Sequence, residues 1–309
     1  MTEEYAGPGE RALALVRGAY DLHVHTAPDV LPRSANDVEV ARRFAHRGMA
    51  GFAIKSHYSP TAGRARLARF VVPEVDVLGS ICLNGPVGGL NPLAVEIAAR
   101  EGARIVWLPT VDAENESPSR RPPDPQGKRP VWAVLQEDLQ RTGVPWEPVR
   151  VVDGNGRPLP ELREVLRVVA RHRMVLATGH LSRDEIFTVV EEARAAGVRW
   201  IVVTHPDFPT QRLSVEDQRQ LARAGAWLER CFGTAHSGKI SWEELAEIIR
   251  AVGAAHSFLS SDLGQVHAPP VEDGLPLLAE RLLALGFQEA QIRTMVENTV
   301  RIARLEGER

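Results

Sequence analysis

The feature that most constrains the fold of this chain is a repeated alternation between short apolar runs and helical patterns. The apolar runs are nearly continuous, as expected for parallel strands that are covered on both sides. The stretches between them begin at capping residues, such as Asn36 and Ser182, and end at glycines, such as Gly48 and Gly197. The expected strands are residues 19–24, 51–54, 75–83, 104–108, 173–177, 199–203, 226–228 and 255–259.

Eight strand–helix units within 309 residues are typical of a closed barrel of parallel strands. We therefore expect an α/β fold, a (β/α)8 TIM-like barrel, formed as one domain by residues 1–309. No G-x-G-x-x-G sequence follows the first expected strand, so a doubly wound dinucleotide-binding sheet is disfavoured.

One segment interrupts the alternation, because residues 112–160 follow the fourth strand and are rich in proline and charge. The insertion leaves the barrel from the carboxyl end of a strand, which is the end where active sites of such barrels lie. Within it we expect a helix over residues 131–141 and a hairpin that turns at residues 154–156. We interpret the insertion as lid-like; a thicker barrel rim or a subunit contact is the alternative.

Histidines and other polar residues are concentrated at the carboxyl ends of the expected strands. His23 and His25 end the first strand, and residues two apart in a strand point the same way, so both are expected to face the barrel axis. Leu22 and Val24 are then expected to face the helices. The other polar residues at strand ends are Lys55, His57, His180, His205, Glu229 and Asp262. All of them should converge on one small volume.

Imidazoles together with a carboxylate form the nitrogen and oxygen set that binds first-row divalent metals. Cys82 and Cys231 have no metal-type spacing, so no thiolate is expected in the set. We expect Zn²⁺ first, with Mn²⁺, Fe²⁺ or Co²⁺ also suited, and one or two ions per chain. The predicted metal ligands are His23, His25, His180, His205 and Asp262.

The predicted catalytic residues are Asp262, Lys55 and His57. A bound divalent ion lowers the pKa of a water molecule to about 7, and Asp262 is expected to orient that water and accept its proton. Lys55 is one of three lysines in the chain. It is a candidate cation for an anionic substrate, a bridging ligand if it is carbamylated, or the partner of Glu229 or Asp21 in an ion pair.

Three further assignments concern the surroundings of the metal. His57 is either an additional ligand or an imidazole that binds the substrate. Asn84, at the end of the third strand, joins Lys55 and Glu229 as a candidate substrate-binding residue. The sequence does not decide whether Glu229 points into the barrel or toward the helices, because the residues after it, Arg230 and Cys231, do not continue an apolar strand pattern.

Composition and charge bear on the binding partners of the protein and on its cellular compartment. The net charge of −3 provides no basic field for nucleic acid or for an anionic membrane surface. The longest uncharged stretch, residues 77–95, is interrupted by glycines and prolines, so no membrane-spanning helix is expected. The first residues lack the pattern of a signal peptide, and two widely separated cysteines suit a reducing compartment. We expect a cytoplasmic protein that binds a small molecule, and a homo-oligomer is left open.

The sequence resembles the amidohydrolase superfamily of metal-dependent hydrolases over nearly the whole chain. The resemblance is carried by Asp-Leu-His-Val-His-Thr at residues 21–26, by His180 and His205, and by Ser-Asp at residues 261–262. It implies the five metal ligands named above. Residues 296–305 also look like the helix that closes many amidohydrolase barrels. The chain is similar, too, to uncharacterised amidohydrolase-like cytosolic proteins, which imply no particular activity.

Some motifs also resemble the PHP-type phosphoesterases. These are the shared residues 21–26, Ile-Lys-Ser-His at residues 54–57, and Val-Thr-His-Pro-Asp at residues 203–207. Lys55 and Ser56 stand where that type has Thr-Asp, and Asn84 stands where it has a glutamate. The fourth strand lacks the bridging lysine or glutamate of two-metal amidohydrolases, which favours one ion unless Lys55 takes that part.

These observations predict a hydrolase that uses metal-activated water to cleave a C–N or C–O bond of amide, lactam or lactone type in a small polar metabolite. Lys55 and an arginine-rich loop, with Arg120, Arg121 and Arg129, favour an anionic substrate. A PHP-type phosphoesterase is the alternative. A barrel that binds a metal without catalysis is the third hypothesis, because a fold alone does not imply turnover.

Overall fold

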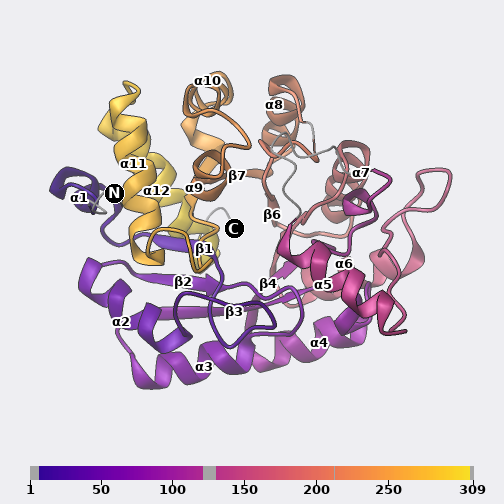
Figure 1. Cartoon of the computed structure of the whole chain (residues 1–309). Helices are drawn as coiled ribbons and strands as arrows, with labels where there is room; N and C mark the ends of the chain where they lie inside the picture. The colour runs from indigo at the N-terminus through magenta and orange to yellow at the C-terminus, as the bar shows by residue number, and fades with distance from the viewer. Residues whose placement is uncertain (1–6, 121–129, 212, 307–309) are drawn as a thin grey trace.

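The chain forms a barrel of eight parallel strands, arranged in sequence order and surrounded by helices (Figure 1). The computed structural model describes residues 7–120, 130–211 and 213–306. The backbone of β8 meets β1 just beyond the strand ends, where Asp262 N donates to His23 O at 2.9 Å and His25 N donates to Leu263 O at 2.8 Å. The predicted (β/α)8 barrel is confirmed. The strands are β1 Tyr20–Val24, β2 Gly51–Ile54, β3 Asp76–Cys82, β4 Ala103–Trp107, β5 Val175–Ala177, β6 Trp200–Val203, β7 Trp227–Cys231 and β8 Ser257–Ser260.

Helices connect successive strands, and several begin and end at the residues that the sequence indicates. Asn36 caps its helix together with Glu39 in a reciprocal capping box, and Gly48 ends the same helix with φ of 67°. Among the described residues, no helix is both long enough and apolar enough to cross a membrane. The α-helices are α1 Glu10–Val16, α2 Asp37–Arg47, α3 Ala62–Val71, α4 Pro92–Glu101, α5 Val131–Arg141, α6 Pro160–Arg171, α7 Arg183–Ala195, α8 Val215–Arg223, α9 Phe232–His236, α10 Trp242–Val252, α11 Gly274–Ala284 and α12 Glu289–Arg304.

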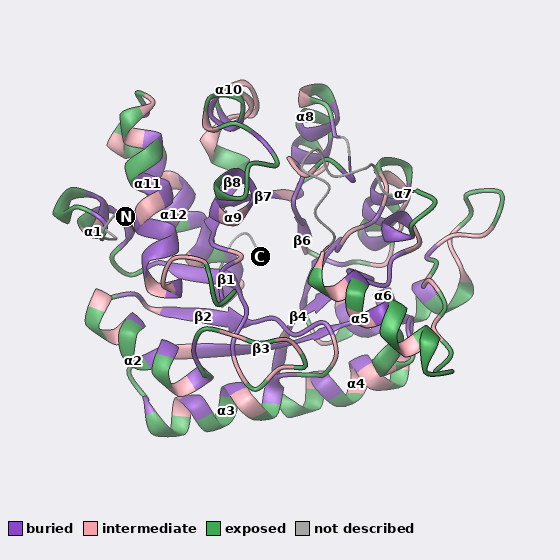
Figure 2. Cartoon of the chain, viewed as in Figure 1, coloured by how far each residue is buried: buried purple, intermediate pink, exposed green. Residues whose placement is uncertain are grey.

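Buried apolar residues cluster in two regions, one between the strands and the helices and one inside the barrel. Figure 2 shows that the strands are buried and that the helices have buried and exposed sides. Val24 packs outward, as predicted, but Leu22 belongs to the cluster inside the barrel, with Ile105 and Phe258. The prediction for Leu22 is therefore wrong. The register between β1 and β2 shifts between Asp21 and Val24, and such an irregularity breaks the strict alternation of side chains.

Helix α12 closes the end of the barrel where the strands begin. Ile302 is fully buried and joins the apolar cluster inside the barrel. Thr299 Oγ1 accepts a hydrogen bond from Tyr20 N at 3.0 Å, and Asn298 Nδ2 donates to Ser257 O at 2.8 Å. These bonds satisfy backbone groups at the start of β1 and β8, and they hold helix α12 in place against the two strands.

Asp112 holds the insertion after β4 together, because its Oδ1 accepts from Trp146 Nε1 at 2.8 Å and from Gln136 Nε2 at 2.7 Å. Its Oδ2 accepts from Gly85 N at 2.8 Å, which joins the insertion to the loop after β3. Helix α5 has the predicted bounds. The predicted hairpin is reduced to one antiparallel bridge, between Val152 and Pro158.

Only part of the arginine-rich loop of the insertion can be compared with the structure. Arg120 pairs with Glu114 at 3.2 Å, whereas Arg121 and Arg129 lie outside the described residues. The lid-like role of the insertion stays a prediction.

Candidate metal centre

Five histidine rings form a closed circle at the carboxyl ends of the strands. Two come from β1 and the segment after it, and the others follow β2, β5 and β6. The structure thus brings together residues that lie far apart in the sequence. The distances between neighbouring ring centres are 5.4 Å for His23–His25, 5.0 Å for His25–His57, 6.3 Å for His57–His180, 5.5 Å for His180–His205 and 4.9 Å for His205–His23.

Asp262 lies beside three of these rings. Its Oδ1 is 3.0 Å from His23 Nε2 and 3.2 Å from His25 Nε2, and its Oδ2 is 3.7 Å from His205 Nε2. Asp262 and His205 both have left-handed backbone conformations, with φ of 54° and 48°. Such strained conformations in residues other than glycine cluster at functional sites, where the surrounding structure enforces them.

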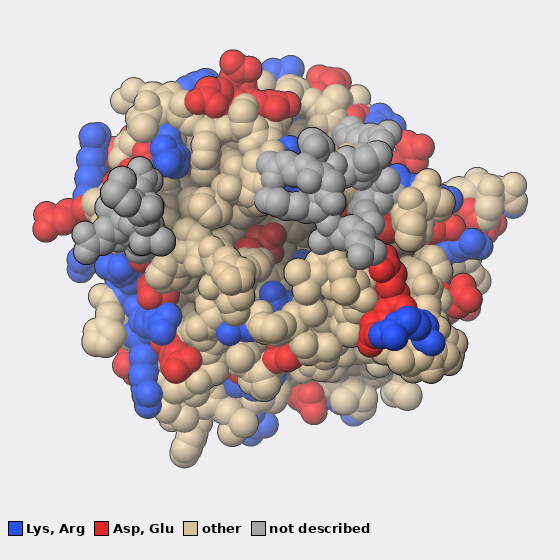
Figure 3. Space-filling model, in the orientation of Figure 1, with Lys and Arg blue, Asp and Glu red and all other residues tan. Residues whose placement is uncertain are grey.

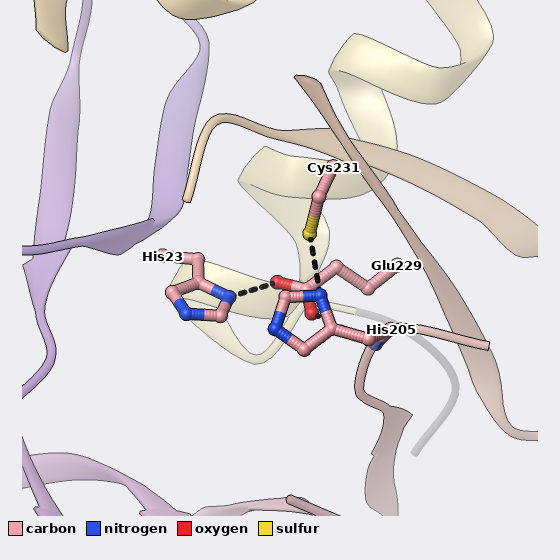
Figure 4. Close-up of side chains that lie close together, drawn as sticks. All are labelled: His23, His205, Glu229 and Cys231. Atoms are coloured by element: carbon pink, nitrogen blue, oxygen red, sulfur yellow. Dashed lines mark hydrogen bonds and ion pairs between the residues drawn. The ribbon is translucent and has the colours of Figure 1, made fainter. Parts of the chain in front are cut away.

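Three of the five rings are held from behind by hydrogen bonds at Nδ1, and the Nδ1 of a fourth, His180, lies close to a carboxylate oxygen without hydrogen-bond geometry. A carboxylate only accepts hydrogen bonds, so the Nδ1 atoms that face carboxylates carry the proton and their Nε2 atoms are left for a ligand. His23 and His205 are shown with their partners in Figure 4. The pairs are His23 with Glu229 Oε1 at 2.9 Å, His57 with Thr110 Oγ1 at 2.8 Å, His180 with Glu116 Oε1 at 3.2 Å and His205 with Cys231 Sγ at 3.3 Å.

The charges of this cluster shift the pKa values of its members. Burial and the Lys55 ammonium lower the pKa of His23, but Asp262 and Glu229 raise it more, to about 9. Burial raises the pKa of Glu229, but His23 more than compensates and lowers it to about 2. The two carboxylates thus favour the protonated form of His23, and a metal ion bound at Nε2 would take the place of a proton there.

Cys231 places a thiol beside the histidines, which the sequence analysis did not anticipate. Its Sγ is 3.3 Å from His205 Nδ1 and 3.1 Å from Ser260 Oγ. Ligand atoms of His23, His205, Glu229 and Cys231 lie within 4.8 Å of one another. Burial raises the pKa of Cys231 well above its usual value, so it is a thiol here. Because Cys231 follows Glu229 by two residues on β7, the alternation rule could have placed both inside the barrel.

Lys55 and Glu229 both point into the barrel. Glu229 bonds His23, which answers the question that the sequence left open. Lys55 forms no ion pair with Glu229 or Asp21. Its Nζ lies 2.9 Å from His23 Nε2 and 5.5 Å from the centre of the Trp107 ring. The cation is thus buried within the histidine circle.

Asn84 connects the loops after β2 and β4 through its side-chain amide. Its Nδ2 donates to His57 O at 2.9 Å and to Thr110 Oγ1 at 2.6 Å. Its Oδ1 accepts from Thr110 N at 2.8 Å and from Asp112 N at 3.3 Å. The amide is fully buried, and each of its polar groups bonds within the protein. A substrate contact of Asn84 stays a prediction.

The first residues of the insertion also build the site, which the sequence did not indicate. Asn115 Nδ2 donates to His180 O at 3.1 Å and to Thr210 O at 3.0 Å. Thr210 Oγ1 donates to Glu116 Oε1 at 3.2 Å, the same atom that faces His180. The segment after β4 therefore ties together the loops after β5 and β6.

The centre of this face of the molecule is hollowed (Figure 3). Acidic side chains lie at the floor of the hollow, and basic side chains lie beside it. Within the cluster, Asp262 and His180 keep some exposure, with 21% and 12% of their side chains accessible.

A family model described as "Family of unknown function (DUF6282)" matches residues 18–229, which is more than half of the chain. The chain belongs to the DUF6282 family. All five histidines of the circle lie within the part that defines this family, whereas Asp262 follows it. No curated protein sequence matches this DUF6282 chain.

Solved structures share the fold of the DUF6282 chain at low sequence identity. An amidohydrolase from Pseudomonas aeruginosa is 13% identical, with a TM-score of 0.61, and the match covers 95% of this chain and 98% of that one. A dipeptidase described as a metallopeptidase is 14% identical, with a TM-score of 0.56 and coverages of 94% and 98%. A mutant organophosphorus hydrolase from Deinococcus radiodurans is 15% identical, with a TM-score of 0.54 and coverages of 96% and 94%. These matches show that the DUF6282 chain shares its fold with the three hydrolases.

Proposed function

We propose that this protein is a metal-dependent hydrolase that cleaves a C–N or C–O bond, of amide, lactam or lactone type, in a small polar metabolite. The observation that supports the proposal is the circle of five imidazoles, three of them beside Asp262, at the carboxyl ends of the strands. Imidazoles and carboxylates are costly to bury unless they are paired or bind a metal. Hydrolytic sites of such barrels also lie at this end.

The residues fit a divalent metal ion. His180 Nε2 and His25 Nδ1 are buried and have no hydrogen-bond partner, so these rings have unused ligand atoms. The three donor atoms His23 Nε2, His25 Nε2 and Asp262 Oδ1 lie within 4.8 Å of one another. Nitrogen and oxygen donors of this kind suit Zn²⁺. The ligands in this proposal are His23, His25, His180, His205 and Asp262, for one or two ions.

A bound divalent ion would lower the pKa of a water molecule to about 7 and polarise the substrate carbonyl. Asp262 accepts the proton in this proposal, because its Oδ1 contacts two histidines while its Oδ2 has only the longer contact to His205. His57 is held through Nδ1 by Thr110, which leaves Nε2 for the substrate. The Lys55 ammonium adds positive charge and favours an anionic group.

Elemental analysis of the purified protein tests the proposal. We expect one or two equivalents of a first-row metal in the wild type and less than a tenth of that in His23→Ala with His25→Ala. His267→Ala is the matched control, because His267 is exposed and lies outside the circle. A wild type that binds no metal after reconstitution would contradict the proposal. With metal present, amides, lactams, lactones and phosphoesters are screened, and turnover of phosphoesters alone would replace the proposed reaction class.

A further inference from the structure

A buried ion pair lies outside the histidine circle, in the layer between β7 and α8. Arg230 Nη1 donates to the two carboxylate oxygens of Asp207 at 2.7 Å and 2.8 Å, and the two side chains are 0% and 3% exposed. Gln218 of α8 joins the pair, because its Nε2 donates to Asp207 Oδ1 at 3.0 Å and its Oε1 accepts from Arg230 Nη1 at 2.7 Å. Leu228, two residues earlier on β7, and Leu221, one turn later on α8, are apolar members of the same layer.

Stability alone does not account for these buried charges. Removing a guanidinium and a carboxylate from water costs free energy, and apolar residues of similar volume are often as stable or more stable in their place. A buried pair with several charge-assisted hydrogen bonds does, however, fix the relative position of its partners. The segments that the pair joins therefore show what it fixes.

Asp207 belongs to the turn that carries His205. Pro206 follows His205 directly, and a residue before proline favours an extended conformation. His205 nevertheless has a left-handed backbone, with φ of 48°. Such a conformation persists in a residue other than glycine only where the surrounding structure enforces it. The bonds of Asp207 to Arg230 and Gln218 attach this turn to both β7 and α8.

Strand β7 thus holds His205 at two points. Inside the barrel, Cys231 Sγ lies 3.3 Å from Nδ1 of the His205 ring. On the outer side of the strand, Arg230 holds the turn through Asp207. Adjacent residues of one strand therefore fix the ring and the backbone of the same histidine, whose Nε2 lies 3.7 Å from Asp262 Oδ2.

We propose that Asp207 is a positioning residue: bound by Arg230, it keeps the turn after β6 in the shape that directs His205 Nε2 toward Asp262. The inference rests on the proposed function, because it takes His205 as a metal ligand. Asp207 acts through His205 and does not touch the ion, since both of its carboxylate oxygens bond to Arg230. Without the pair, His205 should relax toward the extended conformation, and its Nε2 would then leave the circle.

Metal affinity, measured by competition with a chelator, tests the proposal. Asp207→Leu, Gln218→Leu and Arg230→Met are combined, so that no buried polar partner is left alone and the free energy of unfolding in urea should stay close to that of the wild type. We expect this triple variant to bind Zn²⁺ about 10–100-fold more weakly, as is typical when a group behind a metal ligand is lost.

Arg183→Met is the matched control. Arg183 Nε of α7 donates to Asp217 Oδ1 of α8 at 2.9 Å, so this variant also removes an ion pair of α8, but one that does not contact the turn after β6. Its Zn²⁺ affinity should equal that of the wild type.

A thermodynamic cycle separates the positioning of His205 from a general effect on the structure. In a His205→Ala background, the triple substitution should not weaken binding further, because the ligand that it positions is gone. An equal loss in both backgrounds, or no loss in the wild-type background, would overturn the proposal. If the triple variant does not fold, Gln218→Leu, which keeps the ion pair, replaces it in the same cycle, with an expected loss of about threefold to tenfold.

Failure of the proposed function gives a different result. A wild type that binds no metal contradicts the proposed function, whatever the variants do. The positioning of His205 is then read from a crystal structure of the triple variant or, in its place, of Gln218→Leu. An extended His205 supports the inference, and an unchanged left-handed His205 overturns it.

Discussion

The two ends of the barrel are built from the same strands but contain opposite kinds of residue. Strand β1 contributes Leu22 to the apolar cluster inside the barrel, and His25, just beyond the same strand, joins the histidine circle. At β8, Phe258 lies in the apolar cluster, whereas Asp262 follows at the open end. The closed end gains stability from apolar burial, while the open end holds buried charges that cost stability. Stability and chemistry are therefore separated along the barrel axis.

The largest effect that we expect from this separation is on activity at the open end. Asp262→Asn should lower kcat/KM by about 10²–10⁴-fold on any substrate identified by the screen, because the amide cannot accept the proton. The free energy of unfolding in urea is measured in parallel. Asp184→Asn, at an exposed carboxylate of α7, is the control. Full activity in Asp262→Asn would remove Asp262 from the proposed chemistry.

At the closed end, Ile302→Ala should lower the free energy of unfolding by about 2–5 kcal/mol, because it leaves a cavity in the apolar cluster. Metal content per folded chain should stay the same. Ile302→Val, which removes one methylene, should cost only about 0.5–1.5 kcal/mol. Loss of metal in the folded Ile302→Ala protein would mean that the two ends are not separate.

The third prediction concerns Glu116, at the histidine end of the barrel. Glu116 is not a proposed metal ligand, but its Oε1 lies 3.2 Å from His180 Nδ1, and Glu116→Gln tests whether it positions that ring. Partners behind a metal ligand typically contribute 10–100-fold to metal affinity, so we expect a weakening of about that size by competition with a chelator. Glu114→Gln, in the same short segment but paired with Arg150 at the surface, is the control. Equal affinities in both variants would show that Glu116 does not position His180.

The smallest expected effect is at the closed end. Thr299→Val removes the acceptor of the Tyr20 backbone N–H and should cost about 1–2 kcal/mol in urea unfolding, because that group stays buried without a partner. Thr299→Ser keeps the hydroxyl and should cost less. If valine and serine are equally destabilising, the hydrogen bond has no part in closing the barrel.

The barrel was predictable because its strands are short apolar runs separated by clear helix ends, and these patterns are local. Strand β7 shows where this fails. The sequence predicts residues 226–228, but the strand continues to Cys231 through three polar residues. Glu229 and Cys231 face inward, and Arg230 faces outward, where its Nη1 binds Asp207 Oδ1 at 2.7 Å. Successive side chains of β7 thus alternate regularly between the inside and the outside of the barrel. A search for apolar runs misses this part of the strand because these residues are not a continuous apolar run.

The histidines of the site were predictable because they end strands, whereas their supports were not. Glu116 and Thr110 belong to the segment after β4, and they reach His180 and His57 only through the path of that segment in space. Asn84 was expected to bind substrate because it ends a strand, but its hydrogen bonds connect the loops after β2 and β4. Contacts of this kind depend on loop geometry, which spacing in the sequence does not determine.

The hydrogen bonds behind the histidines also have a consequence for conformational entropy. A side chain that is ordered only on binding costs about 0.5–1.5 kcal/mol. Three rings of the circle, those of His23, His57 and His205, are already fixed by hydrogen bonds at Nδ1. A ligand that binds at the centre therefore orders few side chains. The entropy cost of ordering these rings is included in the folding of the barrel and does not weaken ligand binding.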